Sequence, residues 1–229
     1  MVAFEDQEVR VRLEALDAAS LCDAASRAGV AVGVCDPSIN LISAGTKLIG
    51  RVHPVVYDVD FLDVFKALSE AREGEALLIE AESGRAVVGE LFASEARRRG
   101  LAGIVIDGLV RDVATLRRMD LPVFARGTTP QAGTTQVARG AVRAASIGGA
   151  VAVRGDFVVG DEDGVVMIPA DKLDAVLPIA EEIQRSEGTI LEAIGQGRDL
   201  FAHTNLQEHY QKRAEGLPST LSVAPPPVP

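Results

Sequence analysis

Tryptophan is absent from this sequence, and cysteine occurs only twice among its 229 residues. Two cysteines are too few for the disulfide scaffold of a small secreted protein, so we expect reduced thiols in a cytosol. No stretch approaches 18 uncharged apolar residues, which argues against a transmembrane helix. Residues 1–12 carry several charges where a signal peptide has its apolar stretch. These absences predict a cytoplasmic protein with no membrane contact.

Positive charge is scarce as well. The chain has 23 Lys and Arg against 33 Asp and Glu, which gives a net charge of −10. A chain this acidic is not expected to bind nucleic acid as a whole. Its 47% hydrophobic residues exclude a disordered protein. The length is sufficient for one domain with a substantial core.

Lysine is absent from residues 85–126, which contain eight arginines and five acids and therefore carry a local charge of +3. Guanidinium groups match carboxylates and phosphates, so this segment suits a small anionic ligand. The alternative for Arg97, Arg98 and Arg99 is that they form a solvated helix face.

Hydrophobic periodicity predicts an α/β fold. We expect helices over residues 9–29, 61–71, 90–99, 112–119, 170–194 and 200–215, and strands over 47–59, 76–79, 86–88, 104–106 and 122–125, with a loop at 107–110. The central β-α-β-α-β order favours parallel strands covered by helices. Short β segments with glycine turns follow from residue 127 to 168.

The chain is expected to contain one domain. We predict that residues 1–216 form a single α/β domain that includes C-terminal helices. Residues 217–229 contain five prolines and no charge, and we expect a disordered tail there.

Two strand ends next to each other in this pattern carry the candidate chemistry. One strand passes into a helix at Gly89-Glu90, where free amide groups of the first helical turn can bind an anion. The other is followed by Arg111-Asp112. In open α/β sheets, ligands bind at the carboxyl ends of strands, so both segments are expected to line one crevice.

Arg111 could bind a carboxylate through both arms of its guanidinium, and Asp112 could hold Mg²⁺ or Mn²⁺ through one oxygen. Glu90 could add a second carboxylate. The alternative is that Asp112 is only a helix N-cap and Arg111 its surface neighbour, because Asp is a preferred cap.

The stretch from residue 89 to 130, GELFASEARRRGLAGIVIDGLVRDVATLRRMDLPVFARGTTP, resembles the RraA-like family. That family includes class II pyruvate aldolases acting on 4-hydroxy-4-methyl-2-oxoglutarate and 4-carboxy-4-hydroxy-2-oxoadipate. Its signature is an acidic residue, twenty residues, then Arg-Asp, which Glu90 and Arg111-Asp112 match. LCDAASRAG near residue 21 and VVGDEDGVVMIPAD at 158–171 extend the resemblance over most of residues 15–195.

The resemblance implies a site and an architecture. Asp112 would ligate the divalent metal, and Arg111 would bind the carboxylate of a pyruvyl group. The same carboxylate would meet the backbone of four residues, Gly89, Glu90, Leu91 and Phe92. The fold would be a layered α/β/α sandwich of the RraA-like type, related to swivelling β/β/α domains, with a helical C-terminal extension.

Two acids would handle protons. The resemblance implies that Glu90 hydrogen-bonds a water of the metal's shell. An acid on the C-terminal helix of a neighbouring subunit, aligned with Glu187, would complete the water network. The family's members are usually trimers or pairs of trimers, so a homo-oligomer is expected.

The function implied is a metal-dependent lyase that cleaves a 4-hydroxy-2-oxo acid to pyruvate, with oxaloacetate decarboxylation as a side activity. A metal on the keto oxygen and carboxylate would stabilise the enolate of pyruvate. A lysine Schiff base is the other common route, but residues 89–130 contain no Lys.

Two alternatives remain open. The family's name-giving members bind and inhibit an endoribonuclease by protein contact, without catalysis. An enzyme acting on a different 2-oxo or sugar acid is the other alternative, because many members have Gly-Asp-Asn where this chain has Val59-Asp60-Phe61. Glu90 also replaces the Asp of the best-known aldolases, which keeps the charge on a longer arm.

Overall fold

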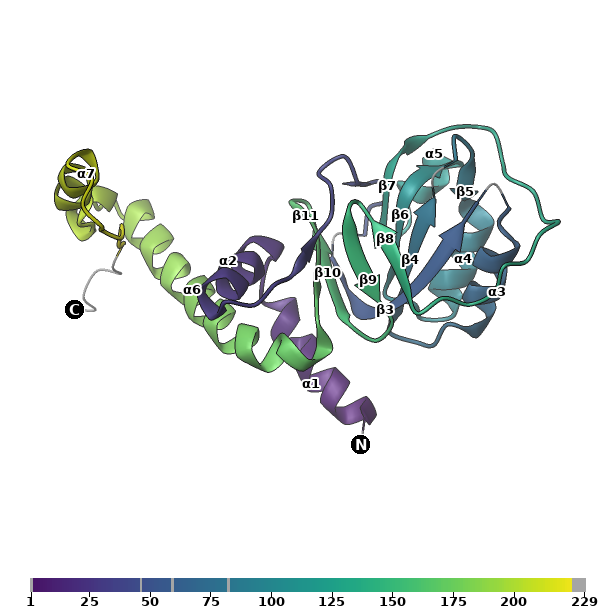
Figure 1. The fold of residues 1–229 in the computed structure, drawn as a ribbon, viewed down its shortest axis with the longest axis horizontal. Helices are drawn as coiled ribbons and strands as arrows, with labels where there is room; N and C mark the ends of the chain where they lie inside the picture. Colours follow the sequence, from purple (N-terminus) through teal and green to yellow (C-terminus); the bar gives the residue numbers. More distant parts are fainter. Residues whose placement is uncertain (1, 46, 59, 82, 224–229) are drawn as a thin grey trace.

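The β-forming segments assemble into one mixed sheet, in a computed structural model that describes residues 2–45, 47–58, 60–81 and 83–223 (Figure 1). The strand order is β1-β11-β10-β3-β4-β6-β7-β2, and β5 also pairs with β6. The strands are β1 (Gly33–Val34), β2 (Asn40–Leu41), β3 (Leu48–Tyr57), β4 (Glu75–Ala81), β5 (Ala86–Val88), β6 (Gly103–Val110), β7 (Val123–Thr128), β10 (Phe157–Asp161) and β11 (Gly164–Ile168). A separate hairpin consists of β8 (Ala144–Ile147) and β9 (Ala150–Val153).

The helices surround this sheet unevenly. They are α1 (Val2–Glu14), α2 (Ala18–Ala28), α3 (Leu62–Glu70), α4 (Glu90–Arg98), α5 (Val113–Leu116), α6 (Leu173–Gly195) and α7 (Leu206–Ala214), with 3-10 turns at Ala170–Lys172 and Leu200–His203. Among the described residues, no helix combines the length and apolar character that crossing a membrane requires.

The centre of the sheet is parallel, as the alternating pattern predicts. β3 pairs with β4, β4 with β6 and β6 with β7, all in parallel. The chain crosses from β4 through β5 and α4 to β6, and then through α5 to β7. Parallel strands end at the same edge of a sheet, so the segments that follow β5, β6 and β7 meet at one edge.

Alternate residues of β3 separate the two faces. Ile49 packs with α1, α2 and α6, while Val55 and Tyr57 pack with α3, α4 and α5. Leu48 and Val52 point the other way, into the cluster formed with the β8–β9 hairpin. Because side chains alternate along a strand, all these helices lie on one face and the hairpin on the other. The α/β class is confirmed, with the β/β/α order of layers.

The C-terminal helix extends well beyond the sheet. Figure 1 shows α6 running from the end of β11 away from α3, α4 and α5, with α7 at its far end. Its first half is buried against α2 through Val176, Ala180 and Ile183, whereas most residues after Ile183 are exposed. The helical C-terminal extension predicted from the sequence is confirmed.

Three local predictions were wrong. Residues 9–29 form two helices, because the Asp17 carboxylate accepts the Ser20 amide and begins a new helix there. Residues 107–110 are not a loop but the end of β6, which pairs with both β5 and β7. The helix predicted at 112–119 has only the four residues of α5, followed by turns.

Residues 217–223, in the segment where we expected disorder, fold back on α7. Asn205 Nδ2 donates to the Thr220 carbonyl oxygen at 3.0 Å, and the Ser222 amide donates to Asn205 Oδ1 at 2.8 Å. Residues 224–229 lie outside the described residues, as does Val59 of the predicted strand 47–59.

Candidate functional site

The two strand ends singled out in the sequence are neighbours in space. β5 pairs with β6 so that Val88 lies opposite Val110. The Arg111 amide donates to the Val88 carbonyl oxygen at 3.0 Å, which places Gly89 beside Arg111. The structure therefore brings together residues that are more than twenty positions apart in the sequence.

The side chain of Asp112 lies at the N-terminus of α4, although the residue itself precedes α5 in the chain. The Glu90 amide donates to Asp112 Oδ2 at 3.1 Å, and Asp112 makes no side-chain cap for its own helix, α5. A carboxylate is stabilised there by the free amide groups of the first turn. Asp112 therefore stands at the N-cap position of α5, as the alternative interpretation held, but its side chain accepts an amide of α4 and does not cap α5.

Gly89 leaves the space that this arrangement requires. A Cβ atom built at Gly89 would lie 2.3 Å from Asp112 Oδ2 and 3.0 Å from Arg111 Cγ. Any larger residue would displace the carboxylate. The need for glycine thus comes from contact with Asp112 and Arg111, since its φ of −134° is open to all residues.

The backbone at Asp112 is strained. Its φ is +58°, the only positive φ of a non-glycine residue in the described part of the chain. This left-handed conformation is unfavourable for residues with a Cβ, and such strain is concentrated at functional sites. The turn after β6 holds the Asp112 side chain against α4.

Arg111 and Asp112 line an open pocket. The other lining residues are Val113, Thr128, Thr129 and Pro130, and the pocket volume is about 350 Å³. Arg111 Nε lies 3.5 Å from Asp112 Oδ2, and both side chains are partly exposed to solvent. A ligand in this pocket could therefore contact the guanidinium and the carboxylate together.

Glu90 points toward α5. Its Oε2 accepts a hydrogen bond of 2.8 Å from Thr115 Oγ1, on the surface beside the pocket. The sequence reasoning missed Thr115, and likewise the pocket-lining Thr128 and Thr129. Thr115 follows Asp112 by three residues, about one helical turn, and this spacing could have indicated that its hydroxyl lies near the site.

Leu91 and Phe92 differ in their surroundings. The Leu91 side chain is 75% exposed. The Phe92 ring makes edge-to-face contacts with Phe61 and Phe65, with centroids 5.7 and 5.5 Å apart. Of this turn, the Glu90 amide is bound by Asp112 at the strand ends.

Glu187 does not join this site within one chain. It is exposed on α6, which Figure 1 shows beside β10 and β11, whereas α4 and α5 lie beside β5, β6 and β7 toward the other edge of the sheet. Any contribution of Glu187 to the pocket would have to come from another copy of the chain.

Metal-ligating side chains are sparse. Across the described residues, no group of three or more His, Cys, Asp or Glu side chains could hold a metal ion. The Asp112 carboxylate is the acidic group on the pocket wall, and Glu90 stands next to it. Such a donor set fits a cation that keeps most of its waters, as Mg²⁺ does.

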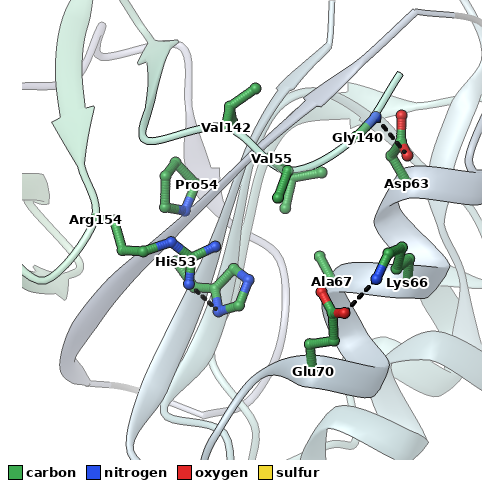
Figure 2. Close-up of a pocket in the computed structure, with 11 residues that line it drawn as sticks. His53, Pro54, Val55, Asp63, Lys66, Ala67, Glu70, Gly140, Val142 and Arg154 are labelled. Carbon is green, nitrogen blue, oxygen red and sulfur yellow. Dashed lines mark hydrogen bonds and ion pairs between the residues drawn. The ribbon is translucent and has the colours of Figure 1, made fainter. Parts of the chain in front are cut away.

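A second cavity lies between β3, α3 and the segment before β8 (Figure 2). His53, Lys66, Glu70 and Arg154 line it, and His53 Nδ1 lies 2.8 Å from Glu75 Oε2. Its free volume of about 20 Å³ has room for about one water molecule. The pocket at the strand ends is therefore the better site for an organic ligand.

Comparison with known proteins identifies the family of this chain. A family model described as "RraA-like: Aldolase/RraA" matches residues 18–167. A Halalkalibacterium halodurans protein named "Putative 4-hydroxy-4-methyl-2-oxoglutarate aldolase" is 33% identical over 154 residues, 66% of this chain and 73% of that protein.

Solved structures show the same architecture. The structure of an uncharacterized protein from Pseudomonas syringae has a TM-score of 0.71 at 29% identity, over 84% of this chain and 94% of that one. The structure titled as the RNA-processing inhibitor RraA from Thermus thermophilis has a TM-score of 0.56 at 26% identity, over 60% and 85% of the two chains.

Proposed function

The chain belongs to the RraA-like family and has its fold, and on this premise we propose that it is a divalent-metal-dependent pyruvate aldolase. The reaction is cleavage of a 4-hydroxy-2-oxo acid of the 4-hydroxy-4-methyl-2-oxoglutarate type to pyruvate. Oxaloacetate decarboxylation is a side activity, because it passes through the same enolate. The single observation that carries this proposal is that Arg111 and Asp112 line one pocket, with the Asp112 carboxylate held by the Glu90 amide.

Arg111 binds the substrate carboxylate in this proposal. Its partly exposed guanidinium lines the pocket and is only weakly engaged with Asp112, at 3.5 Å. A planar fork with several donors matches a carboxylate in a way that a single ammonium does not. The pyruvyl end of the substrate is thereby fixed next to Asp112.

Asp112 would hold Mg²⁺ or Mn²⁺, and the residues present fit such an ion. The carboxylate is on the wall of an open pocket, with oxygen donors and no soft ligand beside it. When bound, the cation supplies positive charge that stabilises negative charge developing on the keto oxygen. The Glu90 amide keeps the Asp112 carboxylate oriented.

Glu90 serves as the proton-handling group of this chain. Its carboxylate is held by Thr115 at 2.8 Å and stays exposed to solvent, so it can exchange protons with water at the pocket edge. The 4-hydroxyl group loses its proton as its carbon becomes the carbonyl carbon of the second product. The electron pair of the broken C3–C4 bond passes to the pyruvyl group as an enolate, which gains one proton to become pyruvate. We assign both proton transfers to water ordered by Glu90.

We further propose that the active unit is a homotrimer or a pair of trimers in the cytoplasm, with Glu187 of a neighbouring subunit completing the site. The position of α6 supports this assembly. Its second half projects from the body with Glu187 exposed, so it can reach a neighbouring copy but not its own pocket.

A lactate-dehydrogenase-coupled assay of pyruvate release tests the function. Oxaloacetate and a panel of 4-hydroxy-2-oxo acids are compared with Mg²⁺, with Mn²⁺ and with EDTA. We expect release that stops in EDTA and returns when either metal is restored. Asp112→Asn should be inactive under all conditions, and full activity in the chelated protein would contradict the mechanism.

The second candidate is a non-catalytic regulator that binds an endoribonuclease. It is favoured by the similarity to the structure titled RNA-processing inhibitor RraA. A third candidate, a lyase for a different 2-oxo or sugar acid, is supported by the aromatic contact of Phe61 with Phe92 next to the site. Pyruvate release from a different member of the panel would select this third candidate, and no release from any member would favour the regulator.

A further inference from the structure

One segment crosses the strand ends on its way from β7 to β8. We call residues 129–140 the strap. Its first residues, Thr129 and Pro130, line the pocket with Arg111. The Thr129 amide donates to the Val110 carbonyl oxygen at 3.0 Å, and the Ala86 amide donates to the Gln131 carbonyl oxygen at 2.7 Å. The strap is thus bonded to the same two strands, β5 and β6, that position Arg111.

Asp60 is the main anchor of the strap. It is only 7% exposed, and its Oδ2 accepts hydrogen bonds from Thr134 Oγ1 at 2.8 Å, from the Val137 amide at 3.0 Å and from the Gln136 amide. Its Oδ1 accepts the Leu62 amide at 3.0 Å, which fixes the carboxylate at the start of α3. One side chain therefore satisfies donors from three positions of the strap.

A second acid holds the end of the strap. Asp63 accepts the Arg139 amide at 2.7 Å and the Gly140 amide at 3.2 Å; the Gly140 contact is drawn in Figure 2. The Arg139 guanidinium pairs with Asp58 on the surface. These acids are remote in sequence from the strap, so they hold it in place without belonging to it.

Apart from these acids, hydrogen bonds within the described part of the chain hold only the first half of the strap: the Phe61 amide donates to the Thr134 carbonyl oxygen at 2.9 Å, and Arg85 donates to the Ala132 carbonyl oxygen at 2.9 Å, besides the bonds to β5 and β6. Most of residues 134–141 are exposed, and none of residues 129–140 belongs to the buried core. A segment with few buried apolar contacts depends on its hydrogen bonds for order. Loss of the Asp60 contacts would therefore loosen the strap at residues 134–137, while the core of the domain keeps its packing.

We infer that Asp60 is a positioning residue for the anion pocket: through the strap, it holds Thr129 and Pro130 against Arg111 and so orders the wall that meets the substrate carboxylate. This inference rests on the proposed function, because it assigns Asp60 to the same pocket. Asp60 does not line the pocket itself, and the residues of the wall that it reaches belong to the strap.

The test compares Asp60→Asn with a matched control, Asp161→Asn. Asp161 also accepts backbone amides, from Ala18 at 2.7 Å and Asp163 at 3.0 Å, but on β10, away from the strap. Thr134→Val, which removes a single bond to Asp60, serves if Asp60→Asn does not fold. Each protein is measured for pyruvate binding by calorimetry in Mg²⁺ buffer, for trypsin cleavage after Arg139, and for its melting temperature.

We expect Asp60→Asn to bind pyruvate about 10-fold more weakly, because the free-energy cost of ordering the pocket wall is then subtracted from the binding free energy. We also expect trypsin to cleave after Arg139 roughly 10-fold faster, because the strap opens more often. Asp161→Asn should lower the melting temperature without changing the pyruvate affinity or the rate of trypsin cleavage. In turnover, Asp60→Asn should raise KM more than it lowers kcat.

Two results would overturn the inference while the proposed function stands. One is Asp60→Asn with faster cleavage but unchanged pyruvate affinity. The other is Asp161→Asn with an equal loss of affinity, which would make the effect one of global stability. A wild-type protein that neither binds nor releases pyruvate would overturn the proposed function and this inference together.

Discussion

At the scale of single residues, the site depends on one glycine that admits one carboxylate. Gly89→Ala would place a Cβ 2.3 Å from Asp112 Oδ2. The carboxylate can rotate away at small cost to the fold, but it then leaves the α4 N-terminus. We expect catalytic efficiency to fall by about 100-fold, as for other displacements of about 1 Å, with little change in melting temperature.

Gly84→Ala is the matched control for this substitution, because a Cβ at exposed Gly84 meets nothing within 4 Å. Its turnover should equal that of the wild type. Equal turnover in Gly89→Ala would show that the contact between Gly89 and Asp112 has no catalytic role.

The second prediction at this scale separates enzyme from binding protein. Arg111→Lys keeps the charge but loses the fork, and a charge-assisted hydrogen bond is worth about 1.5–3 kcal/mol. Catalytic efficiency should therefore fall by roughly 10- to 150-fold, and further in Arg111→Ala. Melting temperatures should stay close to the wild type, since Arg111 is 42% exposed. Unchanged turnover in Arg111→Ala would leave the regulator as the better candidate.

The sequence could predict which residues meet at the site but not how they contact one another. The pattern of strands and helices placed Glu90 and Arg111-Asp112 at strand ends that are neighbours in the structure, because the carboxyl ends of adjacent parallel strands lie together. The positive φ of Asp112, its bond to the Glu90 amide and the role of Thr115 were not predictable. These features arise from the pairing of β5 with β6, which no local pattern encodes.

At the scale of elements, tertiary pairing overrode local signals. β6 continues past Ile106 because its register shifts before Leu109, where it gains β5 as a partner. Gly108 makes this possible, since a Cβ there would lie 2.8 Å from Ala81 Cβ. In the sequence, a glycine after a short apolar run indicates a loop. In the folded sheet, the same glycine allows a bulge.

The strap leads to a prediction about acid stability. Burial works to raise the pKa of Asp60, but its hydrogen bonds with Gln136, Leu62, Thr134 and Val137 outweigh burial and lower it to about 2. A pKa below the unfolded value of 3.8 means that ionised Asp60 stabilises the fold above that pH. This contribution is lost as the pH falls through about 2.

Asp60→Asn imitates the neutral acid, so it isolates this contribution. We expect the variant to melt below the wild type at pH 7, with the difference shrinking between pH 4 and about pH 2. Thermal unfolding of both proteins across this range checks it. A difference that is the same at pH 7 and at pH 2 would contradict the linkage.

At the scale of the whole molecule, the projecting α6 determines what a single chain can do. The acid assigned to the proton network, Glu187, is on α6, which lies beside β10 and β11, whereas Arg111 follows β6 toward the other edge of the sheet. Glu187→Gln should therefore lower turnover in an assembled protein and leave pyruvate binding nearly unchanged. Glu192→Gln, an exposed acid one turn and a half further along α6, is its control.

Mixing two inactive variants tests the shared site directly. If each pocket takes Arg111 from one subunit and Glu187 from the next, Arg111→Ala and Glu187→Gln each have low activity alone but complement each other. In a heterologous ring assembled at random from equal amounts, a pocket is intact when a Glu187→Gln subunit precedes an Arg111→Ala subunit, which is about one pocket in four. We therefore expect about a quarter of wild-type pyruvate release after the two proteins are unfolded together and reassembled. No recovery in an oligomer shown by light scattering to be mixed would mean that Glu187 and Arg111 do not serve one pocket from two chains.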